Sequence, residues 1–184
     1  MKQVKRCCCH LYDHYPPYAP LYAMPYTYEQ SPYYMQPIHQ TQPLNKRMDN
    51  SYSDHGHKPF VTNIQQATNK NDTFRTAIWT GKHLQVTLMS IPISEDIGLE
   101  VHETVDQFLR IEMGHGYVQM GKNKDHLNVS YYVHPGDAIF VPAGVWHNLT
   151  NISNVPLKLY SIYAPPEHPF GTIHVTKQDE VDLP

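Results

Sequence analysis

The sequence predicts an all-β fold, either an antiparallel sandwich or a small barrel, preceded by a disordered leader. Eight or more short segments between residues 74 and 163 are apolar or alternate between apolar and polar residues. Gly, Pro, Asn or Asp stand between these segments at regular intervals, as turn residues do. The same stretch shows no long helical period, and short strands with regular turns are typical of antiparallel sandwiches and barrels.

The leader differs in composition from the rest of the chain, and the change falls near residue 58. Residues 1–58 contain nine of the 14 tyrosines, many prolines and almost no valine or isoleucine. Such a segment cannot bury enough apolar surface to offset the entropy of the chain, so we interpret it as disordered. Its charge is +2, from six basic and four acidic residues, whereas residues 59–184 carry −5, from eight basic and 13 acidic residues. It is either a plain flexible leader or an extended, adhesive segment that anchors the protein in an assembly.

Composition also excludes several classes of protein. The 184 residues suit one domain with an appendage, and a net charge of −3 does not imply a nucleic-acid partner. No apolar run is long enough to span a bilayer, and the basic N-terminus lacks the apolar core of a secretion signal. Cys7, Cys8 and Cys9 are adjacent and no other cysteine follows, which excludes a disulfide framework for the fold. We therefore expect a cytoplasmic protein or, if the leader anchors it, one in a spore coat or surface layer.

The predicted strands follow a segment at residues 60–71 that reads as either a short helix or a loop. We predict strands at residues 74–80, 83–91, 99–102, 107–113, 116–120, 127–133, 138–141, 146–151 and 157–163, and a last short segment at 172–175. Gly81-Lys82 predicts a hairpin, and Pro92 ends the second strand because proline cannot donate to a sheet. The segment 138–141, Ala-Ile-Phe-Val, is apolar throughout, so we expect both faces of this strand to be buried.

A histidine at the start of a strand is the first candidate for function. Pro142 ends the strand before it, and Gly144 supplies the freedom that a tight turn needs. His147 then begins the next strand and is held between two rigid elements. Such a histidine is either an ordinary packed side chain or a functional group, that is, a metal ligand or a catalytic residue. A second cluster of polar residues upstream favours a functional role.

The upstream cluster contains Glu100 and His102, which are two residues apart and therefore point to the same side of a strand. A carboxylate and an imidazole on one face are ligands for first-row metals. If Asp106 faced the interior after the turn, Arg110 and Glu112 would face it too. If Gln107 faced inward, three aliphatic side chains would accompany it, which is far less costly than burying two charges. We therefore predict that Gln107 lies inside and that Asp106 lies outside.

These two stretches resemble the two motifs of the cupin superfamily. The second motif is Gly, five residues, Pro, one, Gly, two, His, three, Asn, and it is matched at every position by Gly136, Pro142, Gly144, His147 and Asn151. In the first motif Glu100 stands in place of the first His, His102 matches the second, and Gln107 stands in place of the Glu. Gly114 keeps the spacing of this motif, whereas Gly98 lies closer than the pattern asks. The amino-acid sequence of residues 74–163 and of the segment after them is similar to the sequences of small bacterial cupins called phosphomannose-isomerase-like.

The resemblance implies a single cupin domain at residues 59–184, a double-stranded β-helix or jelly-roll barrel with its motif core at 98–151. The implied metal ligands are Glu100, His102, Gln107 and His147, in place of the usual three His and one Glu. Two His and one carboxylate still suit Fe, Mn, Ni or Zn, so we expect a divalent first-row metal. Gln107 is either a weak ligand or the group that orients a bound water. A homodimer through sheet edges is also implied.

Two functional hypotheses follow. The first is a metal-dependent enzyme that acts on a small sugar-like or oxygenated organic substrate, of the isomerase or epimerase type or of the dioxygenase type. Arg110 is expected on the outward face, which leaves no cation inside the barrel and disfavours a sugar phosphate. His168 and His174 either cap the open end of the barrel or lie on the surface. The second hypothesis is a non-enzymatic binding or structural protein that its leader tethers to a spore coat or surface layer.

Overall fold

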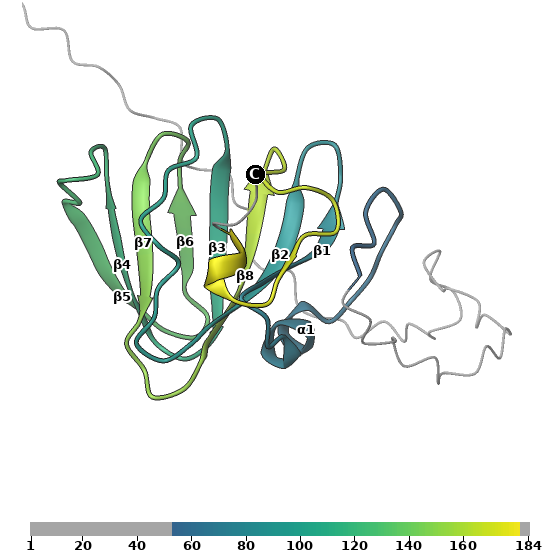
Figure 1. Cartoon of the computed structure of the whole chain (residues 1–184), viewed down its shortest axis with the longest axis horizontal. Helices are drawn as coiled ribbons and strands as arrows, with labels where there is room; N and C mark the ends of the chain where they lie inside the picture. Colours follow the sequence, from purple (N-terminus) through teal and green to yellow (C-terminus); the bar gives the residue numbers. More distant parts are fainter. Residues whose placement is uncertain (1–52, 181–184) are drawn as a thin grey trace, which may run out of the picture. The chain divides into compact units, whose positions relative to one another are not determined.

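The structure is a computed structural model that describes residues 53–180, and within them the chain forms one short helix, a 3₁₀ turn and a set of strands (Figure 1). The helix is α1 (Ile64–Lys70), and the 3₁₀ turn is η2 (Lys177–Glu180). The strands are β1 (Arg75–Thr80), β2 (Gln85–Ile91), β3 (Asp106–Met113), β4 (Gly116–Gly121), β5 (Val129–Val133), β6 (Ala138–Val141), β7 (Trp146–Asn151), β8 (Leu157–Ala164) and β9 (Ile173–His174).

Two antiparallel sheets form the jelly-roll barrel that the sequence predicts. The larger sheet has the order β6-β3-β8-β2-β1-β9, and the smaller one has the order β5-β4-β7. In Figure 1 the smaller sheet lies at the left, and the C-terminal segment crosses in front of β3 and β8. Apolar side chains from both sheets, and two from the segments outside them, form one core: Phe74, Met89, Ile91, Ile97, Leu109, Ile111, Val118, Val133, Ile139, Val141, Leu149, Leu157 and Leu159.

Strand pairing shows which other side chains face this interior. Residues opposite each other in an antiparallel pair project from the same face of the sheet. Leu159 of the core is opposite Met89 on β2 and Ile111 on β3, so alternate residues of these strands point inward. Gln107 lies four residues before Ile111 on β3, an even number that puts both on the same face, and only 3% of its surface is exposed, whereas Asp106 is exposed. The inward placement of Gln107 that the sequence predicted is therefore what the structure shows.

The ambiguous segment before β1 is a helix in its second half. Asn63 caps α1 by accepting a hydrogen bond from the Gln66 backbone N–H at 3.0 Å. The end of the helix is tied to β8 by Lys158, whose buried Nζ donates to the Asn71 carbonyl and to Asp72 Oδ1, the latter at 2.8 Å. These bonds satisfy an ammonium group that would otherwise be costly to bury.

Two local expectations are wrong. Residues 99–102 do not form a continuous strand, and Glu100 instead makes an isolated antiparallel bridge with His147. Strand β6 is buried on one face only, because Phe140 is 70% exposed and packs at its edge against Phe108, with ring centroids 5.1 Å apart. Strand β6 lies at the edge of its sheet, where one face is left uncovered. Its all-apolar sequence does not reveal this position, so the sequence alone could not show that only one face is buried.

Most of the predicted leader, residues 1–58, lies outside the described residues. Its last six residues are described and are hydrogen-bonded to the barrel. The His55 backbone N–H donates to the Ile78 carbonyl at 2.9 Å, and the Trp79 indole donates to the Lys58 carbonyl at 2.9 Å. Among residues 53–180 no helix has the length and hydropathy needed to cross a membrane.

Candidate metal centre

The turn between β6 and β7 fixes the position of His147. Strand β6 ends at Val141, and Gly144 adopts a φ of +75°, a conformation that residues with a Cβ rarely take. Two hydrogen bonds hold the turn: Gly144 N–H donates to the His102 carbonyl at 2.8 Å, and Ala143 N–H donates to Asp106 Oδ1 at 2.9 Å. The turn is therefore attached to the segment that carries the upstream cluster.

Backbone pairing brings Glu100 and His147 face to face. Each donates its N–H to the carbonyl of the other, at 3.0 Å from Glu100 and 2.9 Å from His147. Side chains of a bridged antiparallel pair lie on the same side, and His102, two residues further on, shares that side. In this way residues from two distant parts of the sequence point to one place.

The three side chains form a compact cluster. The Glu100 Oε1 atom is 3.1 Å from His147 Nε2 and 3.5 Å from His102 Nε2. One ligand atom from each residue lies within 4.8 Å of the others, a spacing at which all three could hold one metal ion. Two imidazoles and one carboxylate form a donor set that suits first-row divalent metals.

The outer nitrogens of the two histidines are held by acceptors outside the cluster. His147 Nδ1 is 3.0 Å from the Val145 carbonyl, and His102 Nδ1 is 3.1 Å from Glu167 Oε1. A carbonyl and an ionised carboxylate only accept, so each Nδ1 carries the proton and donates. In the neutral rings each Nε2 therefore turns a lone pair toward the Glu100 carboxylate. A cation between these groups would remove the repulsion, and the same outer hydrogen bonds accompany metal-bound histidines.

Charge interactions shift the pKa values of the cluster. Burial would raise the pKa of Glu100, but the hydrogen bonds that His102 and His147 donate in their protonated forms, together with the charge of Arg75, outweigh it and lower that pKa. Burial would likewise lower the pKa of His102, but the hydrogen bond and the charge of Glu100, with a contribution from Glu167, raise it. Glu100 is thus ionised at neutral pH, and His102 attracts a proton that a metal ion would have to replace.

The fourth predicted ligand, Gln107, occupies the interior beside this cluster. It is opposite Tyr163 on β8, and the Tyr163 ring is 5.6 Å from the His102 ring. Its Nε2 donates to Ser161 Oγ at 3.2 Å, while its Oε1 is buried without a hydrogen-bond partner. The structure thus brings Glu100, His102 and His147 together and leaves the Gln107 oxygen as a free acceptor inside the barrel.

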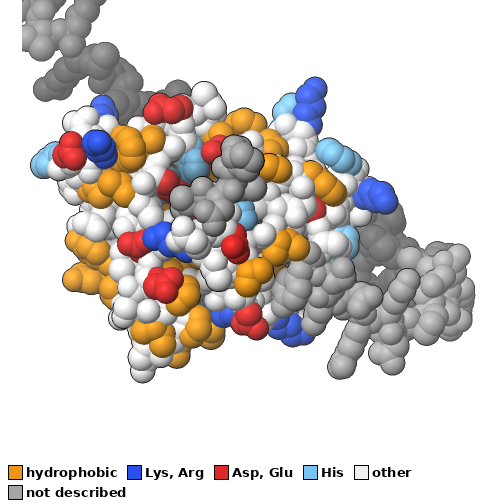
Figure 2. All heavy atoms as spheres, in the orientation of Figure 1, with side chains coloured by type: hydrophobic (Ala, Val, Ile, Leu, Met, Phe, Trp, Pro, Cys, Tyr) orange, Lys and Arg blue, Asp and Glu red, His pale blue; other side chains and the backbone are white. Residues whose placement is uncertain are grey.

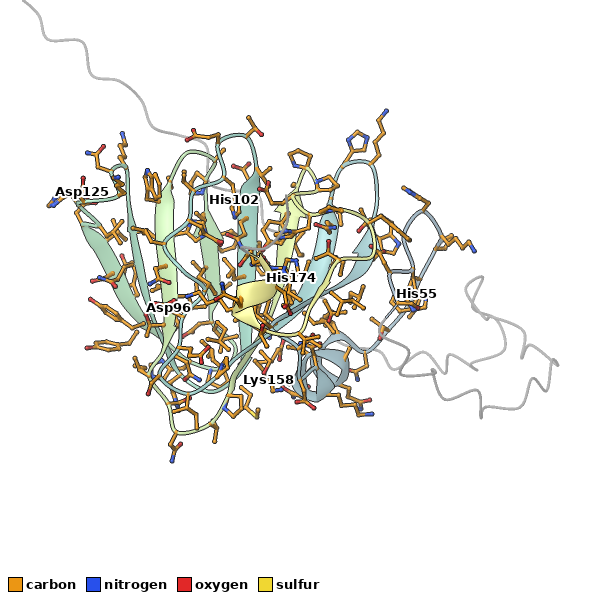
Figure 3. All side chains as sticks on the ribbon, viewed as in Figure 1. His55, Asp96, His102, Asp125, Lys158 and His174 are labelled. Carbon is orange, nitrogen blue, oxygen red and sulfur yellow. The ribbon has the colours of Figure 1, made fainter. Side chains whose placement is uncertain are left out.

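Sequence reasoning missed the charged and aromatic side chains that surround the cluster. Arg75 lies inside the barrel, 1% exposed, so the expectation of an interior without a cation is wrong. His174 is buried and His168 is half-buried, with its ring 5.0 Å from the Tyr163 ring, so neither is an ordinary surface histidine. Figure 3 shows His102 and His174 over the middle of the view, where β3 and β8 run. Burial first, and then the charge of Arg75, lower the pKa of His168 to about 3, which leaves the ring neutral at physiological pH.

Comparison with known proteins agrees with the fold. A model of the cupin domain matches residues 87–163, a range that contains both motifs. The protein YrkC of Bacillus subtilis is 68% identical over 128 residues, which are 70% of this chain and 69% of that protein. The chain belongs to the cupin domain family.

Other relatives of this cupin extend the comparison. The protein L612 of Acanthamoeba polyphaga mimivirus is 44% identical over 119 residues, 64% of this chain and 72% of its own. The crystal structure of BH2720 from Bacillus halodurans is 57% identical, covers 71% of this chain and 99% of its own, and superposes with a TM-score of 0.70. A protein from Klebsiella pneumoniae with a double-stranded β-helix domain, 14% identical with a TM-score of 0.50, covers 64% of this chain and 98% of its own and shows the fold alone.

Proposed function

We propose that this cupin binds one divalent first-row metal ion through Glu100, His102 and His147 and uses it to act on a small oxygenated organic substrate. One observation carries the proposal. Both histidines are fixed from outside by acceptors at Nδ1, and both direct Nε2 at the same carboxylate oxygen. While both rings are neutral, the three ligand groups converge on one point with no proton between them, and a cation at that point would suit them better than their mutual repulsion does.

The remaining interior groups would handle the substrate. A bound metal would polarise an oxygen of the substrate or activate dioxygen. The Gln107 oxygen would accept from a bound water or from a substrate hydroxyl, because it is buried without a partner. Glu167, which holds His102, would keep that ring in the tautomer that leaves Nε2 free. The low pKa of His168 keeps its ring neutral, so its Nε2 would be available as a hydrogen-bond partner.

Metal content tests the first half of the proposal. The full chain would be loaded with Fe, Mn, Ni or Zn, dialysed and analysed for metal, beside Glu100→Gln and the control Glu103→Gln. Glu103 is exposed in the same segment, so its substitution removes the same charge outside the cluster. Four-ligand zinc sites are worth about 10–16 kcal/mol, or roughly 3 kcal/mol per ligand, so Glu100→Gln should weaken binding roughly 100-fold. Wild-type protein without stoichiometric metal would sink the proposal, as would Glu100→Gln that binds like Glu103→Gln.

Two reaction types remain within the proposal, and two measurements separate them. An isomerase or epimerase moves a proton, so the metal-loaded protein should incorporate deuterium from D₂O into substrates such as small aldoses and hydroxy acids. A dioxygenase should consume oxygen in the presence of substrate when loaded with Fe(II). If neither signal appears with any of these compounds, while metal binding is intact, the enzymatic half fails and a binding role is favoured.

The composition of the leader supports a second candidate function, a non-enzymatic cupin held in a spore coat or surface layer. Nine tyrosines and seven prolines lie within residues 1–58. Asp54 Oδ2 accepts a hydrogen bond from Gly171 N–H at 3.0 Å, so a truncation should keep residues 53–58. Removal of residues 1–52 should then release a fluorescently labelled protein from the assembly without unfolding the barrel. Unchanged localisation of the truncated protein would rule this tether out.

A further inference from the structure

Arg75 is the starting point, because this arginine is 1% exposed inside the barrel and yet is not one of the groups that would bind the metal. It is opposite Met89 on β2 and opposite His174 on β9, so its side chain shares the inner face with a core methionine. Its Nη1 donates to Glu180 Oε1, whereas its Nε is buried and has no hydrogen-bond partner. A buried guanidinium whose donors are only partly used is costly unless an acceptor ligand completes its hydrogen bonds.

A second unused donor lies in the same interior and borders the metal centre. Tyr163 is fully buried, and its hydroxyl has no partner. Its ring is in edge contact with His102 on one side and with His168 on the other, at 5.6 and 5.0 Å between centroids. The charge of Arg75 acts on both Tyr163 and Glu100, so the arginine, the phenol and the cluster belong to one interior region. Donors without acceptors in such a region are what an anionic ligand requires.

The carboxylate that now pairs with Arg75 comes from a loosely attached segment. Glu180 is the last residue of η2, and none of the residues in this turn is buried. The turn is held at its start by an ion pair from Lys177 to Asp96 and by the Thr176 N–H, which donates to Asp179 Oδ2 at 2.9 Å. The Glu180 side chain remains 26% exposed while it reaches the fully buried arginine. In the view of Figure 2, histidine and acidic side chains are visible near the middle of the face that η2 crosses.

We propose that Arg75 and Tyr163 form the subsite that binds the carboxylate group of the substrate, and that Glu180 is an internal carboxylate which the substrate displaces. This inference rests on the proposed function for the neighbouring metal centre. The substrate class is then a small carboxylic acid with a hydroxyl or keto oxygen, which reaches Glu100, His102 and His147 while its carboxylate contacts Arg75. Charge balance favours a carboxylate over a phosphate. A monoanion replaces the Glu180 charge one for one, whereas a dianion would place extra negative charge beside Glu100.

Glycolate is the probe, because it combines a carboxylate with a hydroxyl; ethylene glycol and inorganic phosphate are its comparisons. Binding is followed by NMR titration of the ¹⁵N-labelled full chain, both metal-loaded and after chelation. Glu180→Gln should bind glycolate roughly 10-fold tighter than wild type, because the competing charged hydrogen bond is gone. Glu95→Gln removes an exposed charge far along the chain and should leave the affinity unchanged. Tyr163→Phe and Arg75→Lys should both weaken glycolate binding.

The sign of the Glu180→Gln effect decides between a ligand subsite and a structural ion pair. A structural pair predicts that Glu180→Gln lowers the melting temperature and leaves glycolate affinity the same or weaker, and that outcome would overturn the inference. Equal binding of ethylene glycol, or tighter binding of phosphate than of glycolate, would also overturn it. If the proposed metal centre is wrong but the carboxylate subsite is right, the chelated and the metal-treated protein would bind glycolate with the same affinity. Glu180→Gln would still bind glycolate more tightly than the wild type in both states.

Discussion

Asn151, the last residue of the second motif, joins the two sheets through its side chain, and its replacement should be among the most damaging in the barrel. It is 1% exposed. Its Nδ2 donates to the carbonyls of Ile91, Pro92 and Val155, at 3.0, 3.1 and 2.9 Å. Its Oδ1 accepts from Ser153 N–H at 2.9 Å and from Ser153 Oγ at 2.7 Å. One amide therefore ties the end of β2 to the turn that follows β7.

Asn151→Ala should lower the free energy of unfolding by about 3–4 kcal/mol, since the two amide protons and the amide oxygen each satisfy a group worth about 1–1.5 kcal/mol when left unpaired. For a barrel of this size that loss corresponds to a fall in melting temperature of roughly 10 °C. Asn151→Asp keeps the shape but turns an oxygen toward three carbonyl oxygens, so it should cost at least as much as alanine at neutral pH.

The assay is urea denaturation in the presence of a chelator, so that metal binding does not add to the difference. Asn148→Ala is the matched control on the same strand. Asn148 is half-buried and donates a single 3.2 Å bond to Asp96 Oδ2, so its loss should cost about 1 kcal/mol or less. If Asn151→Ala stays within about 1 kcal/mol of wild type, or if Asn148→Ala costs as much, the hydrogen-bond reasoning is wrong.

Three further predictions follow from the site. In the unfolded chain a histidine has a pKa of about 6.5, whereas the folded pKa of His168 is about 3, so the free energy of unfolding falls as the pH is lowered between these values. His168→Asn should flatten this pH dependence of stability, whereas His83→Asn, at an exposed position, should not. A stability profile of His168→Asn parallel to that of the wild type would contradict the prediction. Gln107→Leu should weaken metal binding roughly 10-fold, and Asp106→Ala, which removes only one hydrogen bond to the turn before His147, should weaken it less, with the reverse order in calorimetry arguing against a role for the Gln107 oxygen. Metal at about 100 times its wild-type dissociation constant should stabilise the wild type by about 2.7 kcal/mol but Glu100→Gln, with its roughly 100-fold weaker binding, by only about 0.4 kcal/mol, as thermal melts would show.

The sequence by itself determined the all-β class and one half of the candidate metal centre. Strand β6, its turn and strand β7 follow from Pro142, Gly144 and the alternation around them, because proline and glycine restrict the backbone locally. The inward position of Gln107 was also predictable, because the opposite choice would have turned Arg110 and Glu112 toward the apolar core. These conclusions need only short-range geometry and the cost of burying charge.

Only the tertiary structure decided which side chains surround the predicted part of the candidate metal centre. Strand β1 is covered on both faces, with the neighbours Arg75 and Thr76 both buried, so alternation carries no sign that the arginine points inward. Glu180 is 105 residues away from Arg75 in sequence, and the two meet because β9 adds to the edge of β1. Glu167 reaches His102 from the loop after β8 in the same way. Contacts between residues so far apart depend on how the sheets close, and no local pattern in the chain records that closure.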